Sequence, residues 1–177
     1  SWNKQMPEEI NRILTDHLSA FLFCPTFQAV ENLKKEGIQK NVFHSGDVMF
    51  DAALLAASLS DKHNLILKKT GLQKGAYFLA TLHRAENTDN EIRLKSILSA
   101  LNELSVQKPV VLPIHPRTIK KIRAFGLESL TPNLKIIDPV SFLEMVALEK
   151  NAALILTDSG GVQKEAYFHG IPCITLR

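Results

Sequence analysis

The sequence predicts an α/β fold, in which helices cover both faces of a Rossmann-like parallel sheet in three layers. From residue 76 onward, short apolar stretches alternate regularly with longer stretches of helical periodicity. The apolar stretches are dense and short, which is typical of parallel strands buried on both faces. Polar residues and glycines follow three of these stretches directly. Such sheets have right-handed crossovers and bind ligands beyond the carboxyl ends of their strands.

The first part of the chain predicts a helix, a strand, a second helix and a second strand. Pro7 suits a first helical position, and apolar residues at positions 10, 13, 14 and 18 form a helical stripe. Strands are expected at 20–24 and 42–44. Between them, Thr26 can cap a helix that ends at Gly37.

A stretch rich in alanine and leucine, from Val48 to about Lys69, predicts one or two helices closed by Gly71. This stretch could connect two domains. We therefore expect residues 1–70 to hold the C-terminal part of a first Rossmann-like domain and an inter-domain connection. Residues 71–177 are expected to form most of a second Rossmann-like domain. Both ends of the chain are expected to be cut points in a larger protein.

The second part predicts the alternating elements of the sheet. Strands are expected at 77–82, 110–114, 134–137, 152–156 and 173–176, and helices at 89–107, 118–125 and 141–150. A last helix is expected to begin at Asp158 or Ser159 and to end before Gly170.

Composition predicts an ordinary globular protein, with 45% hydrophobic and 22% charged residues. The net charge of +3 is too small and too scattered to favour nucleic-acid binding. No run approaches the ~18 apolar residues of a membrane span, so we expect a cytoplasmic protein without membrane contact. Cys24 and Cys173 lie in apolar stretches and are expected to be free, buried thiols. No His/Cys cluster has metal-ligand spacing.

The stretch after the strand at 152–156 predicts a site for a nucleoside diphosphate. Ser159 can start a helix, and helix N-termini attract phosphate. Gly160 and Gly161 have no side chain to block that approach. Glu165 lies about one turn into the helix, where its carboxylate could accept hydrogen bonds from ribose hydroxyls. The alternative is a simple tight turn, because the stretch matches neither the phosphate-loop nor the dinucleotide pattern.

Two further polar stretches follow strands at the same end of the predicted sheet. They are His83-Arg84-Ala85-Glu86-Asn87 and His115-Pro116-Arg117. A lone histidine at a strand end is more often structural, and Asn87 could simply cap the next helix. Two His/Arg pairs beside a phosphate turn favour one functional cleft.

These stretches resemble the signature blocks of the UDP-N-acetylglucosamine 2-epimerase family. The matching blocks are residues 83–87, residues 115–117, Asp158-Ser159-Gly160-Gly161-Val162-Gln163-Lys164-Glu165-Ala166, and Met6-Pro7-Glu8-Glu9-Ile10-Asn11-Arg12. Four blocks in the right order over nearly the whole chain are more specific than any one. The resemblance implies the glycosyltransferase-B arrangement, two Rossmann-like domains facing a cleft, with residues 71–177 as the UDP-binding domain.

The resemblance also implies a reaction: interconversion of UDP-N-acetylglucosamine and UDP-N-acetylmannosamine without metal or nicotinamide. UDP leaves C1 while C2 loses its proton, which gives a 2-acetamidoglucal, and UDP then adds back. By resemblance, Glu8 and His83 are catalytic, and His83 either moves a proton or stabilises the diphosphate. The expected substrate-binding residues are Arg84, His115, Arg117, Ser159, Gly160, Gly161 and Glu165. The full-length protein is expected to be a homodimer.

Three alternatives stay open: a hydrolysing epimerase that releases UDP and N-acetylmannosamine, a nucleotide-sugar glycosyltransferase, and a binding module without activity. The non-hydrolysing type is favoured, and residues 1–177 alone are expected to be inactive. Glu8 could instead serve only the dipole of its helix. Two positions depart from the family pattern. Lys164 stands where many members have glutamate, and Phe142 is only a loose match to the aromatic residue expected against uracil.

Overall fold

The computed structural model describes residues 7–62 and 65–176, with the side chains of residues 61 and 62 left aside. The chain divides into two compact units, Ser1–Asp51 and Ala52–Arg177. The division falls inside helix α3 (Val48–Lys62), earlier along the chain than the boundary after residue 70 that the sequence suggested. The identity of the two predicted domains stays a prediction.

The first unit contains two helices and two short strands. They are α1 (Pro7–Leu18), β1 (Leu22–Cys24), α2 (Phe27–Lys35) and β2 (Val42–His44). β1 and β2 are parallel neighbours, with Phe23 opposite Phe43. The predicted cap of α2 is confirmed, because the Thr26 side chain accepts a hydrogen bond from the Ala29 amide over 3.1 Å.

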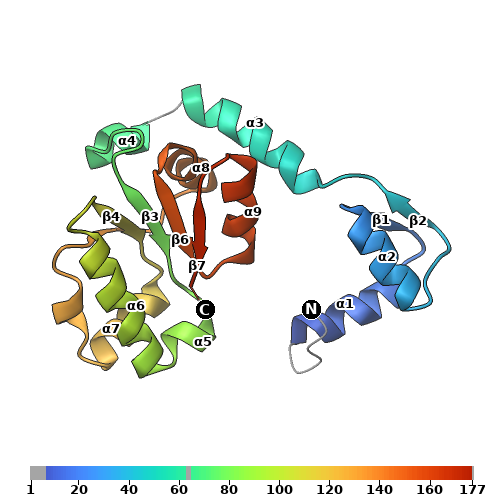
Figure 1. Ribbon diagram of the computed structural model, residues 1–177, viewed down its shortest axis with the longest axis horizontal. Coiled ribbons are helices and arrows are strands. Elements are labelled where there is room, and N and C mark those ends of the chain that lie inside the picture. The colour runs from blue at the N-terminus through green and yellow to red at the C-terminus, as the bar shows by residue number, and fades with distance from the viewer. Residues whose placement is uncertain (1–6, 63–64, 177) are drawn as a thin grey trace. The chain divides into compact units, whose positions relative to one another are not determined.

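The second unit is built on one parallel sheet, as the sequence predicted (Figure 1). Its strands are β3 (Phe78–Thr81), β4 (Val110–Pro113), β5 (Lys135–Ile137), β6 (Leu154–Thr157) and β7 (Cys173–Thr175), in the spatial order β5-β4-β3-β6-β7. Its helices, besides most of α3, are α4 (Leu65–Thr70), α5 (Ala85–Thr88), α6 (Glu91–Leu104), α7 (Pro116–Ala124), α8 (Phe142–Asn151) and α9 (Gly160–Phe168), with a 3-10 turn at Glu128–Leu130.

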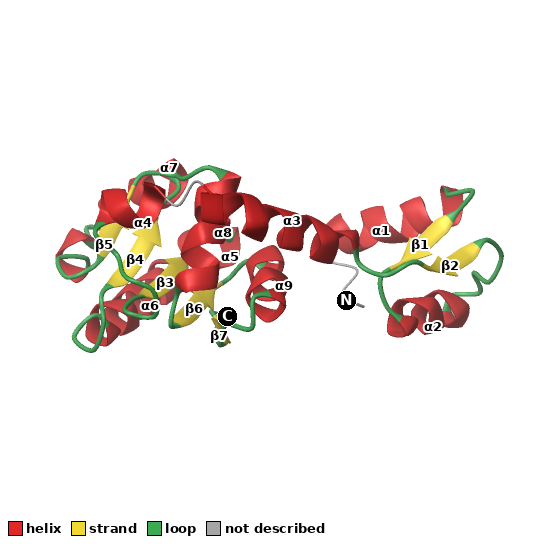
Figure 2. Cartoon of the chain, turned by 90° about the horizontal axis from the view of Figure 1, so that it is seen from above, coloured by secondary structure: helices red, strands yellow, loops and turns green. Residues whose placement is uncertain are grey.

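Hydrophobic side chains cover both faces of this sheet, and the views of Figures 1 and 2 agree on helices at each side. Successive residues of β4 alternate between two clusters: Val110 and Leu112 pack with α6 and α7, whereas Val111 packs with α4, α8 and α9. This alternation is the two-residue period of a strand buried on both faces. The predicted fold class is therefore confirmed.

The order of the strands reverses between β3 and β6, which predicts a crevice at the carboxyl ends of these two strands. The chain runs outward from β3 to β4 and β5, and then returns to the other side of β3 with β6. Thr81 and Thr157 are register partners at the ends of these two strands, and their hydroxyl groups are hydrogen-bonded. Reversals of this kind are where open α/β sheets bind ligands.

The structure corrects two details. Asn90, not Asn87, caps α6, because α5 forms a separate short turn before it. Cys24 is buried, but Cys173 is exposed, since β7 lies at the edge of the sheet and all three of its residues are exposed. Both thiols are free.

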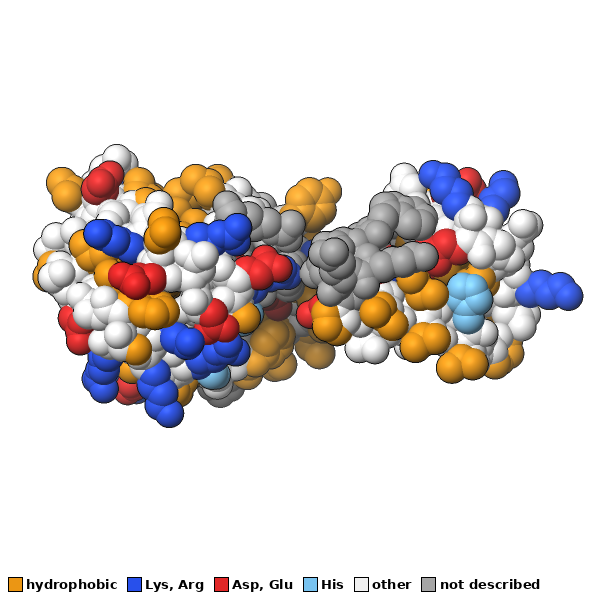
Figure 3. All heavy atoms as spheres, turned by 90° about the horizontal axis from the view of Figure 1, so that it is seen from below, with side chains coloured by type: hydrophobic (Ala, Val, Ile, Leu, Met, Phe, Trp, Pro, Cys, Tyr) orange, Lys and Arg blue, Asp and Glu red, His pale blue; other side chains and the backbone are white. Residues whose placement is uncertain are grey.

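Charged side chains of both signs are interspersed on the face of the larger unit shown in Figure 3. Within residues 7–62 and 65–176, no helix is both long enough and apolar enough to cross a membrane.

Candidate active site

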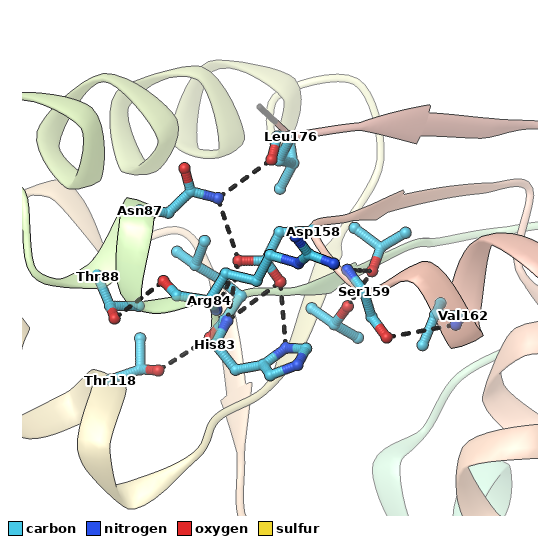
Figure 4. A network of polar contacts seen from close by, with 12 residues as sticks. His83, Arg84, Asn87, Thr88, Thr118, Asp158, Ser159, Val162 and Leu176 are labelled. Atoms are coloured by element: carbon cyan, nitrogen blue, oxygen red, sulfur yellow. Dashed lines mark hydrogen bonds and ion pairs between the residues drawn. The ribbon is translucent and has the colours of Figure 1, made fainter. Parts of the chain in front are cut away.

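A buried carboxylate organises the crevice between β3 and β6 (Figure 4). Asp158 directly follows β6 and is completely shielded from solvent. It accepts hydrogen bonds from the backbone amides of His83 and Arg84, the latter over 2.9 Å, and from Asn87 Nδ2 over 3.1 Å. Its Oδ1 lies 3.1 Å from His83 Nδ1. Asp158 therefore joins the loop after β3 to the turn after β6.

Two further contacts hold the His83 loop in place. Asn87 Nδ2 also donates to the carbonyl oxygen of Leu176, and the Thr118 hydroxyl donates to that of Leu82. The sequence placed Asp158 and Asn87 in the signature blocks but gave neither a site role, with Asp158 as a helix-starting residue and Asn87 as a possible cap. The available signal for Asp158 was a carboxylate placed directly after a buried strand, at the switch of the sheet.

The two predicted histidines present opposite nitrogens. His83 Nδ1 faces a carboxylate, so this nitrogen bears the proton and Nε2 is the acceptor in the neutral ring. His115 Nδ1 accepts a hydrogen bond from the Arg117 amide over 3.2 Å, so its proton lies on Nε2. One ring can therefore accept a proton, while the other can donate a hydrogen bond to an anion.

Both histidines line one hollow of about 220 Å³ at the carboxyl end of the sheet. Its other walls are mostly apolar and include Pro113, Val140 and Met145. Phe142, considered for the base contact, is 56% exposed and is not among the residues that line this hollow. The hollow thus brings together the loops after β3 and β4, whereas the glycine turn, which the sequence placed in the same cleft, is not among its lining residues.

The glycine turn forms the predicted start of α9. The Ser159 side chain accepts from the Val162 amide, and the Ser159 amide donates to the Thr157 hydroxyl over 2.9 Å. Gly160 and Gly161 do not have positive φ, and a Cβ atom on either would meet no close contact. The fold itself therefore does not require glycine at these positions. Open space in front of first-turn amides suits an incoming phosphate.

Arg117 forms an ion pair with Asp89 and is not among the residues that line the hollow beside the two histidines. Its Nη2 lies 2.6 Å from Asp89 Oδ2, and Lys121 Nζ lies 3.0 Å from Asp89 Oδ1. The hydrogen bond from Lys121, assisted by the charge of Arg117, holds the pKa of Asp89 below its usual value. Arg84 has no such carboxylate partner among the described ion pairs, and its side chain extends toward Ser159 in the view of Figure 4.

The two predicted glutamates lie in different units. Glu165 is half-buried in the second turn of α9, and burial raises its pKa. Glu8 is exposed in the first turn of α1, in the first unit. The roles assigned to both residues stay predictions.

Comparison with known proteins gives the context for this geometry. The family model described as UDP-N-acetylglucosamine 2-epimerase matches residues 1–177. The chain is 51% identical to a UDP-N-acetylglucosamine 2-epimerase homolog of Methanococcus maripaludis, and 50% identical to UDP-2,3-diacetamido-2,3-dideoxy-D-glucuronate 2-epimerase of Pseudomonas aeruginosa. Both matches cover 100% of this chain. They cover 50% of the length of the first relative and 49% of the length of the second.

A solved structure is similar over the same extent. The Methanocaldococcus jannaschii UDP-GlcNAc 2-epimerase in complex with UDP-GlcNAc and UDP has a TM-score of 0.89 and 46% identity, over 100% of this chain and 51% of that one. The chain thus spans about half the length of the relatives it matches. It belongs to the UDP-N-acetylglucosamine 2-epimerase family.

Proposed function

We propose that the protein containing this chain is a non-hydrolysing UDP-N-acetylglucosamine 2-epimerase, and that the described crevice binds the UDP part of its substrate. The observation that supports this most directly is the junction at Asp158. One buried carboxylate holds His83 on one side and continues into Ser159, Gly160 and Gly161 on the other. A catalytic histidine and a phosphate turn are thereby fixed to each other.

The turn would support the leaving diphosphate. Amides at the start of α9, with the positive end of its dipole, favour the charge that develops as UDP departs from C1. Arg84 and the Nε2–H of His115 would add donors, and Arg117 would contribute only after leaving Asp89. Glu165 would hold the ribose hydroxyls.

We assign separate roles to His83 and Glu8 in the proposed reaction. C2 of the sugar is not acidic, so loss of its proton must accompany departure of UDP, and a positioned base is required. The Asp158 carboxylate orients the His83 ring through Nδ1. We assign His83 to stabilisation of the departing UDP and Glu8 to proton transfer at the sugar. His83→Asn should cut turnover severely and leave the fold intact.

A second candidate substrate has specific support. The Pseudomonas aeruginosa relative, named for a diacetamido glucuronate, is about as similar to this chain as the relative named for UDP-N-acetylglucosamine. The residues proposed to bind UDP would contact the part that both substrates share, so both sugars belong in the test.

Proton NMR of the full-length protein in deuterated water tests the proposal. UDP-N-acetylglucosamine should give UDP-N-acetylmannosamine that has deuterium at C2. Free N-acetylmannosamine and UDP would establish the hydrolysing reaction instead. Turnover of only UDP-2,3-diacetamido-2,3-dideoxy-D-glucuronate would replace the substrate. No reaction with either sugar would leave a transferase or a binding module, and the proposal would be wrong. Residues 1–177 alone should give no product, because Glu8 would lack its opposing catalytic groups.

A further inference from the structure

A buried carboxyl group without an assigned role lies in helix α8, which packs against α9. The Glu149 side chain is completely shielded from solvent. No hydrogen-bond donor among the described residues pairs with either of its oxygens. A charged carboxylate is expensive in such a place, so Glu149 needs either a cation or a proton.

The ionisable group that acts on Glu149 belongs to Glu165, the predicted ribose contact. Burial and, after it, the negative charge of Glu165 raise the pKa of Glu149 to about 9. Hydrogen bonding between the two side chains raises the pKa of Glu149 and opposes the burial-driven rise of the pKa of Glu165. Glu149 is completely buried whereas Glu165 is half-buried, so the proton belongs on Glu149, which can donate it to a charged Glu165.

The surrounding charged groups do not replace that proton. Lys150 Nζ donates to the carbonyl oxygen of Ala57 over 3.0 Å. Burial, and then the charge of Lys150, lower the pKa of His169 on α9, which keeps that ring neutral. Lys68 and Lys69 are exposed on α4, and Lys164 is exposed on α9. A neutral carboxylic acid is thus the stable form of Glu149 near neutral pH.

We propose that Glu149 is a positioning residue for nucleotide binding: its carboxylic acid donates a hydrogen bond to Glu165 and holds that carboxylate ready for the ribose hydroxyls of a nucleoside diphosphate. This inference rests on the proposed function, which assigns the ribose to Glu165. An ionised carboxylate accepts about four hydrogen bonds, so one bond from Glu149 leaves room for a 2′,3′-diol. Fixing the side chain in advance lowers the entropy that binding must remove.

Two substitutions in the full-length protein separate the hydrogen bond from mere packing. Glu149→Leu keeps the volume but removes the donor, and Glu149→Gln keeps an N–H donor without an ionisable group. UDP binding by calorimetry should weaken about tenfold or more in the leucine variant, because a hydrogen bond to a charged group is lost. The glutamine variant should stay close to wild type.

A second ligand separates a specific effect on the ribose contact from a general structural effect of the substitution. 2′,3′-Dideoxy-UDP lacks the hydroxyls that Glu165 would hold, so its affinity should be the same in wild type and in Glu149→Leu. Unchanged UDP affinity in Glu149→Leu would overturn the proposal. Equal weakening of both ligands would overturn it as well, because it would mean a general distortion of the site.

The pH dependence has a definite sign. The raised pKa of Glu149 keeps its proton in place below about pH 9. Above that pH both carboxyl groups would be charged and would repel each other, so wild type should lose UDP affinity relative to Glu149→Gln. The variants are compared at each pH, since uracil itself titrates in alkaline solution. If UDP affinity changes with pH in the same way in wild type and in Glu149→Gln, the proposal is wrong.

Glu165→Gln tests the proposed ribose contact of Glu165 separately from the proposed positioning role of Glu149. If this variant binds UDP as wild type does, the ribose assignment in the proposed function is wrong. If it binds weakly but Glu149→Leu does not, only the positioning role of Glu149 is wrong.

Discussion

The two compact units bury their hydrophobic side chains to very different degrees. In the second unit, large residues such as Leu79, Leu98 and Leu148 are completely buried around the sheet. In the first unit, the buried hydrophobic residues among those described are Cys24 and Leu33. Its five phenylalanines all stay exposed: Phe21 (59%), Phe23 (71%), Phe27 (73%), Phe43 (47%) and Phe50 (41%). Hydrophobic side chains accordingly lie on the surface of the smaller unit in Figure 3.

A network of ion pairs joins the two helices of the first unit. Arg12 lies 2.8 Å from Glu9, 2.7 Å from Asp16 and 2.9 Å from Glu36, which joins α1 to α2. A two-stranded parallel sheet gains little stability alone. Asp158, by contrast, receives its hydrogen bonds from backbone amides and Asn87 inside the close-packed second unit, where such a network is stronger than at a surface.

The largest expected effect comes from the core of the second unit. Leu98→Ala should lower the free energy of unfolding by about 2–5 kcal/mol, because it removes buried methyl groups and leaves a cavity. The matched change in the first unit, Phe23→Ala, should cost less than about 1 kcal/mol in residues 1–177, since the ring is exposed. Urea unfolding measures both. Equal costs would show that the first unit has a core of its own.

A somewhat smaller effect is expected at the junction. Asp158→Asn turns an amide group toward the N–H donors of His83 and Arg84, and one buried acceptor is lost. The expected loss is about 2–4 kcal/mol in the free energy of unfolding. Asp16→Asn, the matched change at a partly exposed carboxylate in the Arg12 network, should cost less than about 1 kcal/mol.

Nitrogen NMR of the His83 ring adds a local measurement to the Asp158→Asn experiment. The substitution should move the proton preference away from Nδ1. A ring that keeps its Nδ1 proton in this variant would remove Asp158 from the orientation of His83, whatever the stability change.

The sequence predicted the elements well because their signals are local. The alternation of apolar stretches predicted the parallel sheet, and Thr26 and Ser159 were recognisable as residues that start helices. The strands ended within a few residues of the expected positions, and Val42–His44 agreed at both ends. The resemblance to the family was confirmed by the match over residues 1–177.

The missed features depend on contacts between distant segments. Asp158 meets the His83 loop across the switch of the sheet, and Arg117 meets Asp89, so neither pairing has a local pattern. Glu149, in contrast, did have a local sequence pattern. It continues the stripe of positions 142, 145 and 146 on α8, so a carboxylate on an apolar face was visible and passed unnoticed. Burial of Cys173 was overestimated because strand order, not the strand itself, decides which strand lies at an edge.

The smallest effect is expected from the Arg12 network, and it should depend on salt. Arg12→Met keeps the apolar stem but removes the charge shared by Glu9, Asp16 and Glu36. The expected loss is about 1 kcal/mol at low ionic strength, because the arginine is one-third exposed, and it should shrink as salt screens the charges. Leu98→Ala should show no such salt dependence. Arg12→Lys, which keeps a charge but not the planar fork, should lie between wild type and Arg12→Met. A salt-independent loss in Arg12→Met would mean that the stem packs as a core residue, and the contrast between the two units would then be one of degree only.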